Sequence, residues 1–184
     1  MFNLRNLRES DEAMVLKWRN SPQVAPYMLR DTPITEIEHH KWFSKAKNDS
    51  PVSIIRILED EEQPLGLVSL TNIDREELSC DWGGYLAPTI SRGSGLGKAL
   101  IYMSINLAIE EFDIEVFKVE VIVGNDNAIR LYESCGFEYK QLIKHRFIRP
   151  SGPVDVLEYS LNRLQWISAR DAIKKRLIDL DLFG

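Results

Sequence analysis

The sequence predicts one α/β domain in which helices pack on a single sheet. Segments with strand periodicity alternate with segments of helical periodicity along the chain. No internal repeat, low-complexity tract or linker interrupts them. The 184 residues, 44% hydrophobic and 28% charged, suffice for one sizeable core. We expect a domain over residues 1–163 and a helical extension over residues 164–184 that packs on it.

The first part of the chain predicts a strand followed by two helices. Residues 2–7 have strand composition, and a helix is expected to start after Ser10, a good N-cap, and to run through Trp18. Two prolines then predict a loop. Thr35 and Glu38 have the spacing of a capping box, so the second helix is expected to begin there.

The middle of the chain predicts a hairpin and a third strand that turns into a helix. Residues 52–58 and 65–73 are rich in β-branched side chains and flank an acidic turn. Residues 82–86 end the third strand, and a helix is expected to begin near Gly95. Apolar residues recur at helical spacing in this helix, so one of its faces should pack on the sheet.

The last third of the chain predicts a second half of the sheet and a terminal helix. The expected elements are an apolar strand at 116–123, a helix at 125–135 that Gly136 ends, strands at 137–144 and 154–161, and a helix at 164–182. The two strands should be joined through a turn that contains proline and glycine.

Composition and charge exclude several classes of protein. A net charge of −5 gives no broad cationic surface for nucleic acid or an anionic membrane. No apolar run approaches the roughly 18 residues of a membrane span, and the polar N-terminal segment does not resemble a signal peptide, so we expect a cytoplasmic protein. Cys80 and Cys135 are expected to be buried free thiols. The adjacent His39 and His40 lack the further ligands of a zinc site, so no metal is predicted.

Residues 92–98, with the sequence RGSGLGK, form a glycine-rich turn from strand to helix. Backbone N–H groups at such a helix N-terminus are unpaired, and glycine lets an anion approach them closely. Because Arg92 and Lys98 add positive charge, the turn predicts a pyrophosphate site; the alternative is a tight connection without a ligand. A mononucleotide P-loop is excluded because Ala99 follows Lys98. A dinucleotide fingerprint fits poorly because the turn follows three strands expected to be antiparallel.

A second motif, Asn125-x-Asn127-Ala128-x-x-x-Tyr132-x-x-x-Gly136-Phe137, follows further along the chain. Together with Arg92-x-x-Gly95-x-Gly97 it resembles the GNAT superfamily of acetyl-CoA-dependent N-acetyltransferases. The two motifs cover about residues 82 to 137, and the predicted element order extends the match to about residue 162. The resemblance implies a central mixed, mostly antiparallel sheet with helices on both faces and a splayed pair of central strands.

The resemblance also implies how acetyl-CoA binds. The backbone amides of residues 93–98 would hold the pyrophosphate, and pantetheine would lie between the strands at 82–86 and 116–123 like an added strand. A backbone N–H near Leu86 would polarise the thioester carbonyl. The predicted cofactor residues are Tyr85, Leu86, Arg92, Gly93, Ser94, Gly95, Leu96, Gly97, Lys98, Asn125, Asn127 and Arg130.

Two residues are predicted to act in catalysis. Tyr132 matches the family tyrosine near the cofactor sulfur, where a protonated phenol would act as general acid towards the departing thiolate. The alternative for Tyr132 is a core aromatic on an apolar helix face. Asp81 has the position of a family acidic residue and would accept the amine proton directly or through water. The alternative for Asp81 is a solvated charge at a strand edge.

The acceptor is predicted from a second, looser resemblance. The segments that carry it are residues 18–22, Tyr27, Met28, His39, residues 70–73 and residues 154–156. They are similar to the nucleotide-sugar N-acetyltransferases of pseudaminic acid synthesis, which acetylate the 4-amino group of UDP-4-amino-4,6-dideoxy-N-acetyl-β-L-altrosamine before the sugar decorates flagellin. The resemblance implies that Arg19, His39, Thr71 and Asn72 surround the nucleotide. For Arg19 and His39 the alternative is an exposed helix position.

Three other functions remain open at this point. A protein N-terminal acetyltransferase of the ribosomal-protein type shares the same cofactor motifs and would bind a peptide amine. An enzyme for another nucleotide-linked amino sugar, such as a dTDP-4-amino-6-deoxyhexose, fits as well. A non-catalytic acyl-CoA-binding module could keep the fold without turnover, although Tyr132 argues against it. The sequence also leaves the oligomeric state open, a homodimer included.

Overall fold

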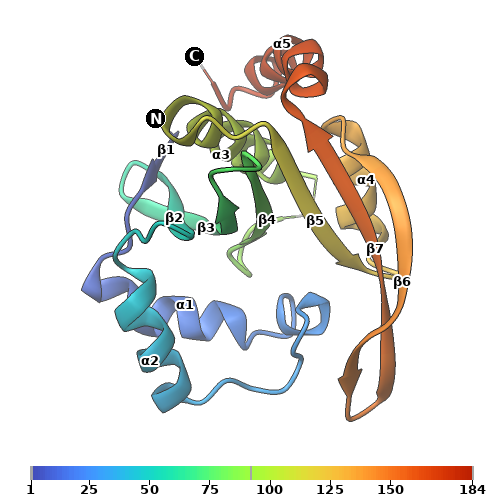
Figure 1. Cartoon of the computed structure of the whole chain (residues 1–184). Coiled ribbons are helices and arrows are strands. Elements are labelled where there is room, and N and C mark those ends of the chain that lie inside the picture. Colours follow the sequence, from blue (N-terminus) through green and yellow to red (C-terminus); the bar gives the residue numbers. More distant parts are fainter. Residues whose placement is uncertain (1, 92, 184) are drawn as a thin grey trace.

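The computed structural model describes residues 2–91 and 93–183, which form a seven-stranded sheet in the order β1-β2-β3-β4-β5-β7-β6 (Figure 1). The strands are β1 Phe2–Arg5, β2 Ser53–Asp60, β3 Gln63–Asp74, β4 Ser79–Leu86, β5 Val116–Ile122, β6 Glu138–Arg149 and β7 Gly152–Asn162. The pair β4 and β5 is parallel, and the other neighbouring strands are antiparallel. This confirms the predicted α/β class with a mixed, mostly antiparallel sheet.

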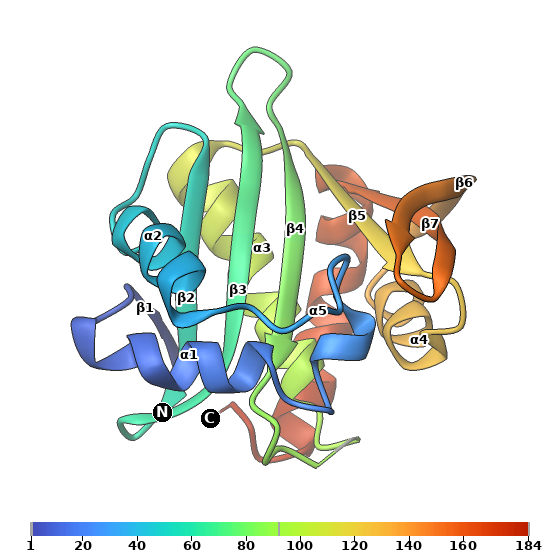
Figure 2. The ribbon, with the colours of Figure 1, turned by 90° about the horizontal axis from the view of Figure 1, so that it is seen from below.

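Helices cover both faces of the sheet (Figure 2). The helices are α1 Glu12–Arg19, α2 Glu36–Ala46, α3 Leu96–Phe112, α4 Asp126–Ser134 and α5 Arg163–Asp179, with short 3-10 turns η1 Glu9–Asp11 and η2 Ala25–Tyr27. Two buried clusters correspond to the two faces. Val15 of α1 and Phe43 of α2 pack with Leu67 of β3, whereas Ile105 of α3 packs in the other cluster with Trp82 of β4.

The parallel pair of strands separates halfway along its length. β4 pairs with β5 through Ser79 opposite Val116, Cys80 opposite Phe117, and Asp81 opposite Lys118. Beyond that point β4 continues along β3 and β5 continues along β7, so the two strands diverge while each keeps its other neighbour. Two strand edges with unpaired backbone groups therefore face each other. The splayed central pair implied by the family resemblance is present.

Two of the predicted helix boundaries are confirmed and one is wrong. The hydroxyl of Thr35 accepts the Glu38 N–H, and the Glu38 carboxylate accepts the Thr35 N–H at 2.9 Å, which is the predicted capping box. Gly95 is the N-cap of α3 in the left-handed region, with φ of 85°. Ser10 does not cap a helix. It lies inside η1, and the Asp11 carboxylate instead accepts the Arg8 N–H at 2.7 Å.

Both hairpins are longer than predicted. β2 and β3 run up to a two-residue turn at Glu61 and Glu62, which both have positive φ. β6 and β7 likewise extend to Arg149 and Gly152.

Within the described residues, no helix combines the length and the apolar character needed to cross a membrane.

Candidate functional site

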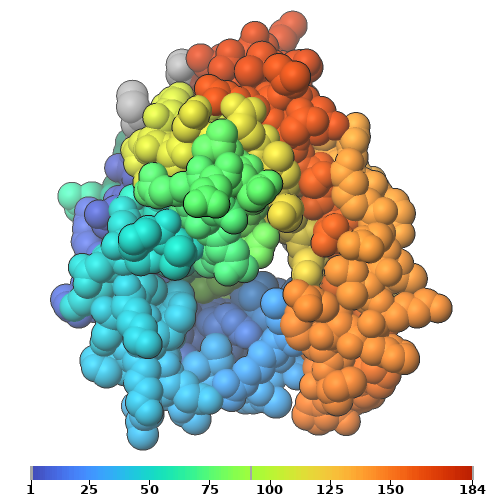
Figure 3. Space-filling view, viewed as in Figure 1, coloured from blue at the N-terminus to red at the C-terminus, as the bar shows by residue number. Residues whose placement is uncertain are grey.

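A cavity of about 1030 Å³ occupies the gap between the diverging ends of β4 and β5. Gly93 and Ser94 of the turn before α3 line one end, and Thr71 and Asp81 line the other. In the space-filling view a hollow separates the N-terminal helices from the β6–β7 hairpin (Figure 3). The cavity thus joins the predicted phosphate turn to the point where the strands separate.

The turn before α3 has the conformation that an anion site needs. Gly93 and Gly95 have φ of 82° and 85°, a region that side chains rarely adopt. No heavy atom lies within 4 Å of the position that a Cβ would take at Gly93, so the space in front of this turn is open. Gly97 and Lys98 also line the cavity. The exposed amides at the start of α3 therefore fit a diphosphate.

The structure does not confirm a side-chain contact with the cavity for two predicted cofactor residues of this segment, Arg92 and Leu96. The Leu96 side chain is 8% exposed and packs in the core, so only its backbone faces the turn. Arg92 lies outside the described residues.

The start of α4 forms the opposite wall. The Asn125 side chain caps the helix by accepting the Ala128 N–H at 3.3 Å. The Asn127 side-chain oxygen accepts a hydrogen bond of 3.0 Å from Arg130. Asn125, Asn127 and Arg130 all line the cavity. The structure therefore brings these predicted residues together with the turn before α3.

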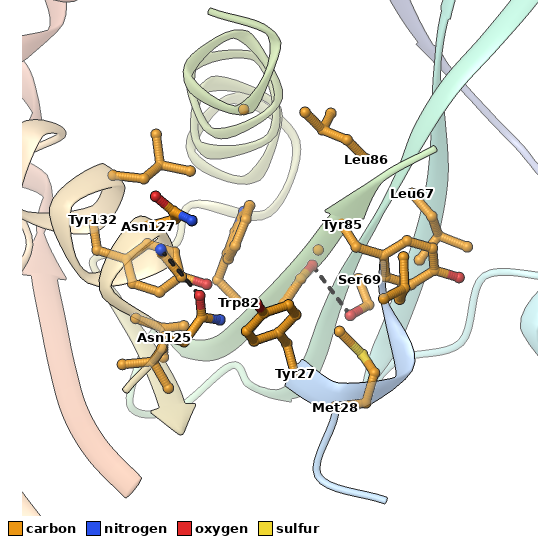
Figure 4. Close-up of a pocket in the computed structure, with 18 of the residues that line it drawn as sticks. Tyr27, Met28, Leu67, Ser69, Trp82, Tyr85, Leu86, Asn125, Asn127 and Tyr132 are labelled. Atoms are coloured by element: carbon orange, nitrogen blue, oxygen red, sulfur yellow. Dashed lines mark hydrogen bonds between the residues drawn. The ribbon is translucent and has the colours of Figure 1, made fainter. Parts of the chain in front are cut away.

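Tyr132 is both a core aromatic and a cavity residue. Its side chain is 7% exposed and lies edge-on to Trp82, with 5.8 Å between the ring centroids. The Trp82 ring is fixed in turn because its N–H donates to Ser104 at 2.8 Å. Burial raises the pKa of the Tyr132 phenol well above its usual value, so the group is protonated at neutral pH. Figure 4 shows Tyr132 and Asn125 facing Tyr27 and Met28 across the cavity.

Asp81 lies where the two strands part. Thr71 is its register partner on β3, and Lys118 is its register partner on β5. The Asn72 side-chain amide donates to the Asp81 carboxylate at 2.7 Å. Asn72 reaches it from an irregular position in β3, with φ of 49°. Asp81, Thr71 and Asn72 thus form one polar group at the cavity end opposite the phosphate turn.

Three further charged residues at this end were not predicted from the sequence: Glu120, Arg146 and Glu158. Arg146 of β6 donates to both carboxylate oxygens of Glu120 on β5, at 3.1 Å each. Glu158 lies opposite Glu120 on β7. The alternating pattern of β5 indicates that Lys118 and Glu120 share a face of the sheet. That Arg146 of β6 is the residue that binds Glu120 could not be predicted, because the register of β6 is shifted by a bulge in this part of the strand.

The wall on the side of α1 and α2 is formed by uncharged residues. Tyr27 and Met28 reach in from η2, and Ser69 and Tyr85 lie on the sheet below them. Tyr85 and its register partner Leu67 belong to the α1 and α2 side of the sheet. The side chain of the predicted cofactor residue Tyr85 therefore lies on the α1 and α2 face of the sheet, away from α3. Leu86, the other predicted cofactor residue of β4, also lines the cavity.

Arg19 lies beside this wall rather than in it. One terminal nitrogen donates to the Arg30 carbonyl, and the other, Nη1, is buried without a partner among the described residues. Burial lowers the pKa of the Arg19 guanidinium, the nearby Tyr85 phenol opposes this, and Arg30 and Arg149 lower it further. Arg30 pairs with Glu38, and the Asp31 carboxylate opposes the lowering of the Arg19 pKa.

The structure does not bring His39 into the cavity. Its ring is 3% exposed, and Nε2 donates to the Glu12 carbonyl at 2.9 Å, which holds α2 against α1. Burial lowers the His39 pKa, so the ring is neutral at pH 7. His39 is excluded from the cavity because its side chain lies on the face of α2 that packs against α1.

The described residues contain no group of side chains arranged to hold a metal ion. Both described cysteines are buried and free.

Comparison with known proteins adds three findings. Residues 2–138 match the family model described as an acetyltransferase (GNAT) domain. Acetyltransferase PseH of Campylobacter jejuni is 28% identical over 135 residues, which cover 73% of this chain and 82% of that protein. Spermidine N(1)-acetyltransferase of Vibrio cholerae is 24% identical over 148 residues, which cover 80% of this chain and 85% of that protein.

Solved structures agree with the family match at the level of the fold. The crystal structure of spermidine N-acetyltransferase from Vibrio cholerae in complex with CoA and spermine superposes with a TM-score of 0.82 at 22% identity. The superposition covers 90% of this chain and 98% of that chain. A likeness at this identity concerns the architecture and not the substrate.

Proposed function

Because this chain belongs to the GNAT acetyltransferase family, we propose that it acetylates the 4-amino group of a UDP-linked 4-amino-4,6-dideoxy sugar. The chain is an acetyl-CoA-dependent N-acetyltransferase, as its relatives are. The choice of acceptor rests on the resemblance to the enzymes of pseudaminic acid synthesis, and the similarity to Acetyltransferase PseH supports it. Modification of flagellin would be the downstream use of such a product.

The observation that carries this choice is the position of Arg19 beside the cavity wall, with one guanidinium nitrogen that has no hydrogen-bond partner among the described residues. Its Nη1 is buried and has no partner among the described residues, and its guanidinium interacts with Tyr85, which lines the acceptor wall. The positive charge of Arg19 beside this wall would attract an acceptor that brings a diphosphate to this side. A cationic acceptor would be repelled. We therefore favour an anionic acceptor.

The residues of the site can be given roles in the transfer. The amides of the turn before α3 would bind the diphosphate of the donor, and a backbone N–H near Leu86 would stabilise the oxyanion as the amine nitrogen attacks the acetyl carbonyl. Asp81, oriented by Asn72, would accept the proton that the nitrogen loses. Tyr132 would give its proton to the departing thiolate sulfur. The donor supplies the acetyl group on an activated thioester.

A panel of acceptors tests the proposal. Free thiol release from acetyl-CoA would be followed with the UDP-4-amino sugar, dTDP-4-amino sugars, spermidine and N-terminal peptides. We expect kcat/KM for the UDP sugar to exceed that of spermidine and of the peptides by about 100-fold, because those acceptors lack the diphosphate for which the site is proposed to be built. Arg19→Met should raise KM for the UDP sugar and leave the weak spermidine rate unchanged. Preference for a peptide or for spermidine would refute the sugar assignment.

Polyamine acetylation is the second candidate. Asp81, Glu120 and Glu158 line one end of the cavity, and carboxylates of this kind attract an extended polycation. The similarity to spermidine N(1)-acetyltransferase of Vibrio cholerae supports this candidate as well. Lys118 and the Arg146 bound to Glu120 offset most of that negative charge, which is why we rank it second.

A further inference from the structure

We propose that α5 is part of the CoA-binding site and that Arg176 on this helix binds the 3′-phosphate of CoA together with Lys98. The inference rests on the proposed use of acetyl-CoA and adds a binding residue outside the two sequence motifs. It also assigns a role to the C-terminal helix beyond covering α3.

Arg176 lies at the phosphate end of the cavity. Arg176 and Leu180 line the main cavity together with the turn before α3. A second recess of about 200 Å³ adjoins this end and is lined by Lys98, Ser134, Ala169, Ala172, Ile173 and Arg176. Three of these residues, Lys98, Ser134 and Arg176, line both hollows. A ligand that follows the main cavity past the turn would therefore meet the recess next.

The helix is held firmly against the turn. The Trp166 and Leu177 side chains are fully buried, and the Trp166 N–H donates to Asn106 of α3 at 2.9 Å. After the helix, the side chains of Leu180 and Leu182 come so close to Gly95 that a Cβ there would lie 2.8 Å from each. Because these contacts fix α5 relative to the start of α3, the Arg176 side chain extends from a rigid base beside the phosphate turn.

The charges of the recess point to a second phosphate. Neither Lys98 nor Arg176 forms an ion pair or hydrogen bond with another described residue. The amides at the start of α3 already fit the diphosphate, so two further unpaired cations next to them exceed what that group requires. CoA carries one more phosphate, on the 3′ position of its ribose. The alanine and isoleucine side chains of the recess provide apolar surface for the attached nucleoside.

Binding of CoA and of 3′-dephospho-CoA separates this role from others. Dissociation constants would be measured calorimetrically for the wild type, Arg176→Ala and Lys175→Ala. We expect Arg176→Ala to weaken CoA binding about tenfold and to leave 3′-dephospho-CoA binding unchanged, since a charge-assisted contact to phosphate is lost. Lys175→Ala is the matched control, because Lys175 is a neighbouring exposed cation that lines neither hollow. It should change neither constant.

The possible outcomes are distinct. Equal CoA affinity in Arg176→Ala and the wild type would overturn the inference while leaving the proposed function intact. Equal weakening of both ligands would assign Arg176 to the diphosphate and overturn the 3′-phosphate assignment. Failure of the wild type to bind CoA at all would refute the proposed function along with the inference. Arg176 is exposed on the helix, and an unchanged melting temperature of the variant would confirm that the fold is intact.

Discussion

At the scale of single residues, Tyr132 shows that a buried aromatic and a general acid need not be alternatives. The ring packs against Trp82 and Phe137, and these contacts fix its orientation. The same burial that makes it part of the core raises the pKa of its phenol and keeps the proton in place. A donor to a thiolate requires both a fixed position and a retained proton.

The first prediction concerns Tyr132→Phe. We expect kcat to fall about 100-fold, because that is the usual contribution of a positioned general acid, while CoA affinity stays unchanged. Since the pKa of Tyr132 lies above its ordinary value, the wild-type rate should not decline through loss of this proton up to about pH 9.5. Steady-state rates from pH 6 to pH 9.5 would test both points. Tyr139→Phe, on an exposed tyrosine, is the control, and a Tyr132→Phe variant with half the wild-type kcat would rule out the role.

The second prediction concerns the pair of Asp81 and Asn72. Asp81→Asn removes the proton acceptor, and we expect kcat/KM to fall about 100-fold. Asn72→Ala removes only the 2.7 Å hydrogen bond that orients the carboxylate, so a loss of about tenfold is expected. Initial rates at saturating acetyl-CoA would measure both. If Asp81→Asn were the milder variant, the base would have to be another group, with Glu120 and Glu158 next to be tested.

Sequence reasoning predicted the cavity-lining residues that belong to motifs and missed or misplaced the residues whose positions are fixed by tertiary contacts. Residues 93–98 and Asn127 follow from spacing along one strand-to-helix turn and one helix start. His39 lies on a helix that was predicted, but the sequence does not say that its face meets α1. Arg146 and Glu120 are joined across strands that are distant in the chain, and no local pattern reports such a pair.

At the scale of elements, the β6–β7 hairpin and the η2 turn are joined by Arg149. Its side chain donates to the carbonyls of Pro26 at 3.3 Å, Leu29 at 3.4 Å and Met28. Asp31 lies 3.8 Å away, and the Arg149 side chain is 11% exposed. The sequence predicted both strands but ended the first too early, at residue 144, and began the second too late, at residue 154, because the turn residues around Pro150 are also compatible with a longer loop. The extension is what brings Arg149 to η2.

The third prediction follows from this contact. Arg149 touches neither predicted reacting group, but it holds the segment that presents Tyr27 and Met28 to the cavity, so it is a positioning residue. Arg149→Met should raise KM for the acceptor about tenfold and change kcat and CoA affinity little, because the loss concerns acceptor binding alone. Lys144→Met, at an exposed position of the same strand, is the control. An equal loss of CoA affinity would indicate a general loosening of the fold.

At the scale of the whole molecule, the sequence predicted the order of elements along the chain and a mixed, mostly antiparallel sheet with helices on both faces, but not the ion pairs that hold the edge of that sheet. β1 is a short edge strand, and it is held by Arg5, which donates to Asp11 at 2.6 Å and pairs with Glu59 of β2. The Asp11 and Glu59 side chains are 5% and 4% exposed. Three charged side chains from three different elements meet here. The sequence does not predict these ion pairs, because none of the three residues belongs to a recognisable motif.

This buried group makes the stability of the protein depend on pH in a defined direction. Burial by itself raises the pKa of the Asp11 carboxyl, but hydrogen bonds from Arg5 and the Arg8 N–H outweigh it and hold the pKa below its ordinary value. Because the folded pKa is lowered, the contribution is fully present above the unfolded pKa of about 4 and is lost as pH falls through the folded pKa.

The fourth prediction is that Arg5→Met lowers the free energy of unfolding by about 3 kcal/mol at pH 7, since it removes the guanidinium that pairs with both buried carboxylates and leaves them only their contacts with Arg8. The difference from the wild type should narrow at pH 3, where the Asp11 carboxyl that lost its partner is protonated at little cost. Urea unfolding at both pH values would measure it. Lys47→Met removes the partner of the exposed Glu9 and should cost less than about 0.5 kcal/mol at either pH. An Arg5→Met penalty that is the same at pH 7 and pH 3 would mean that the arginine acts through packing and not through its charge.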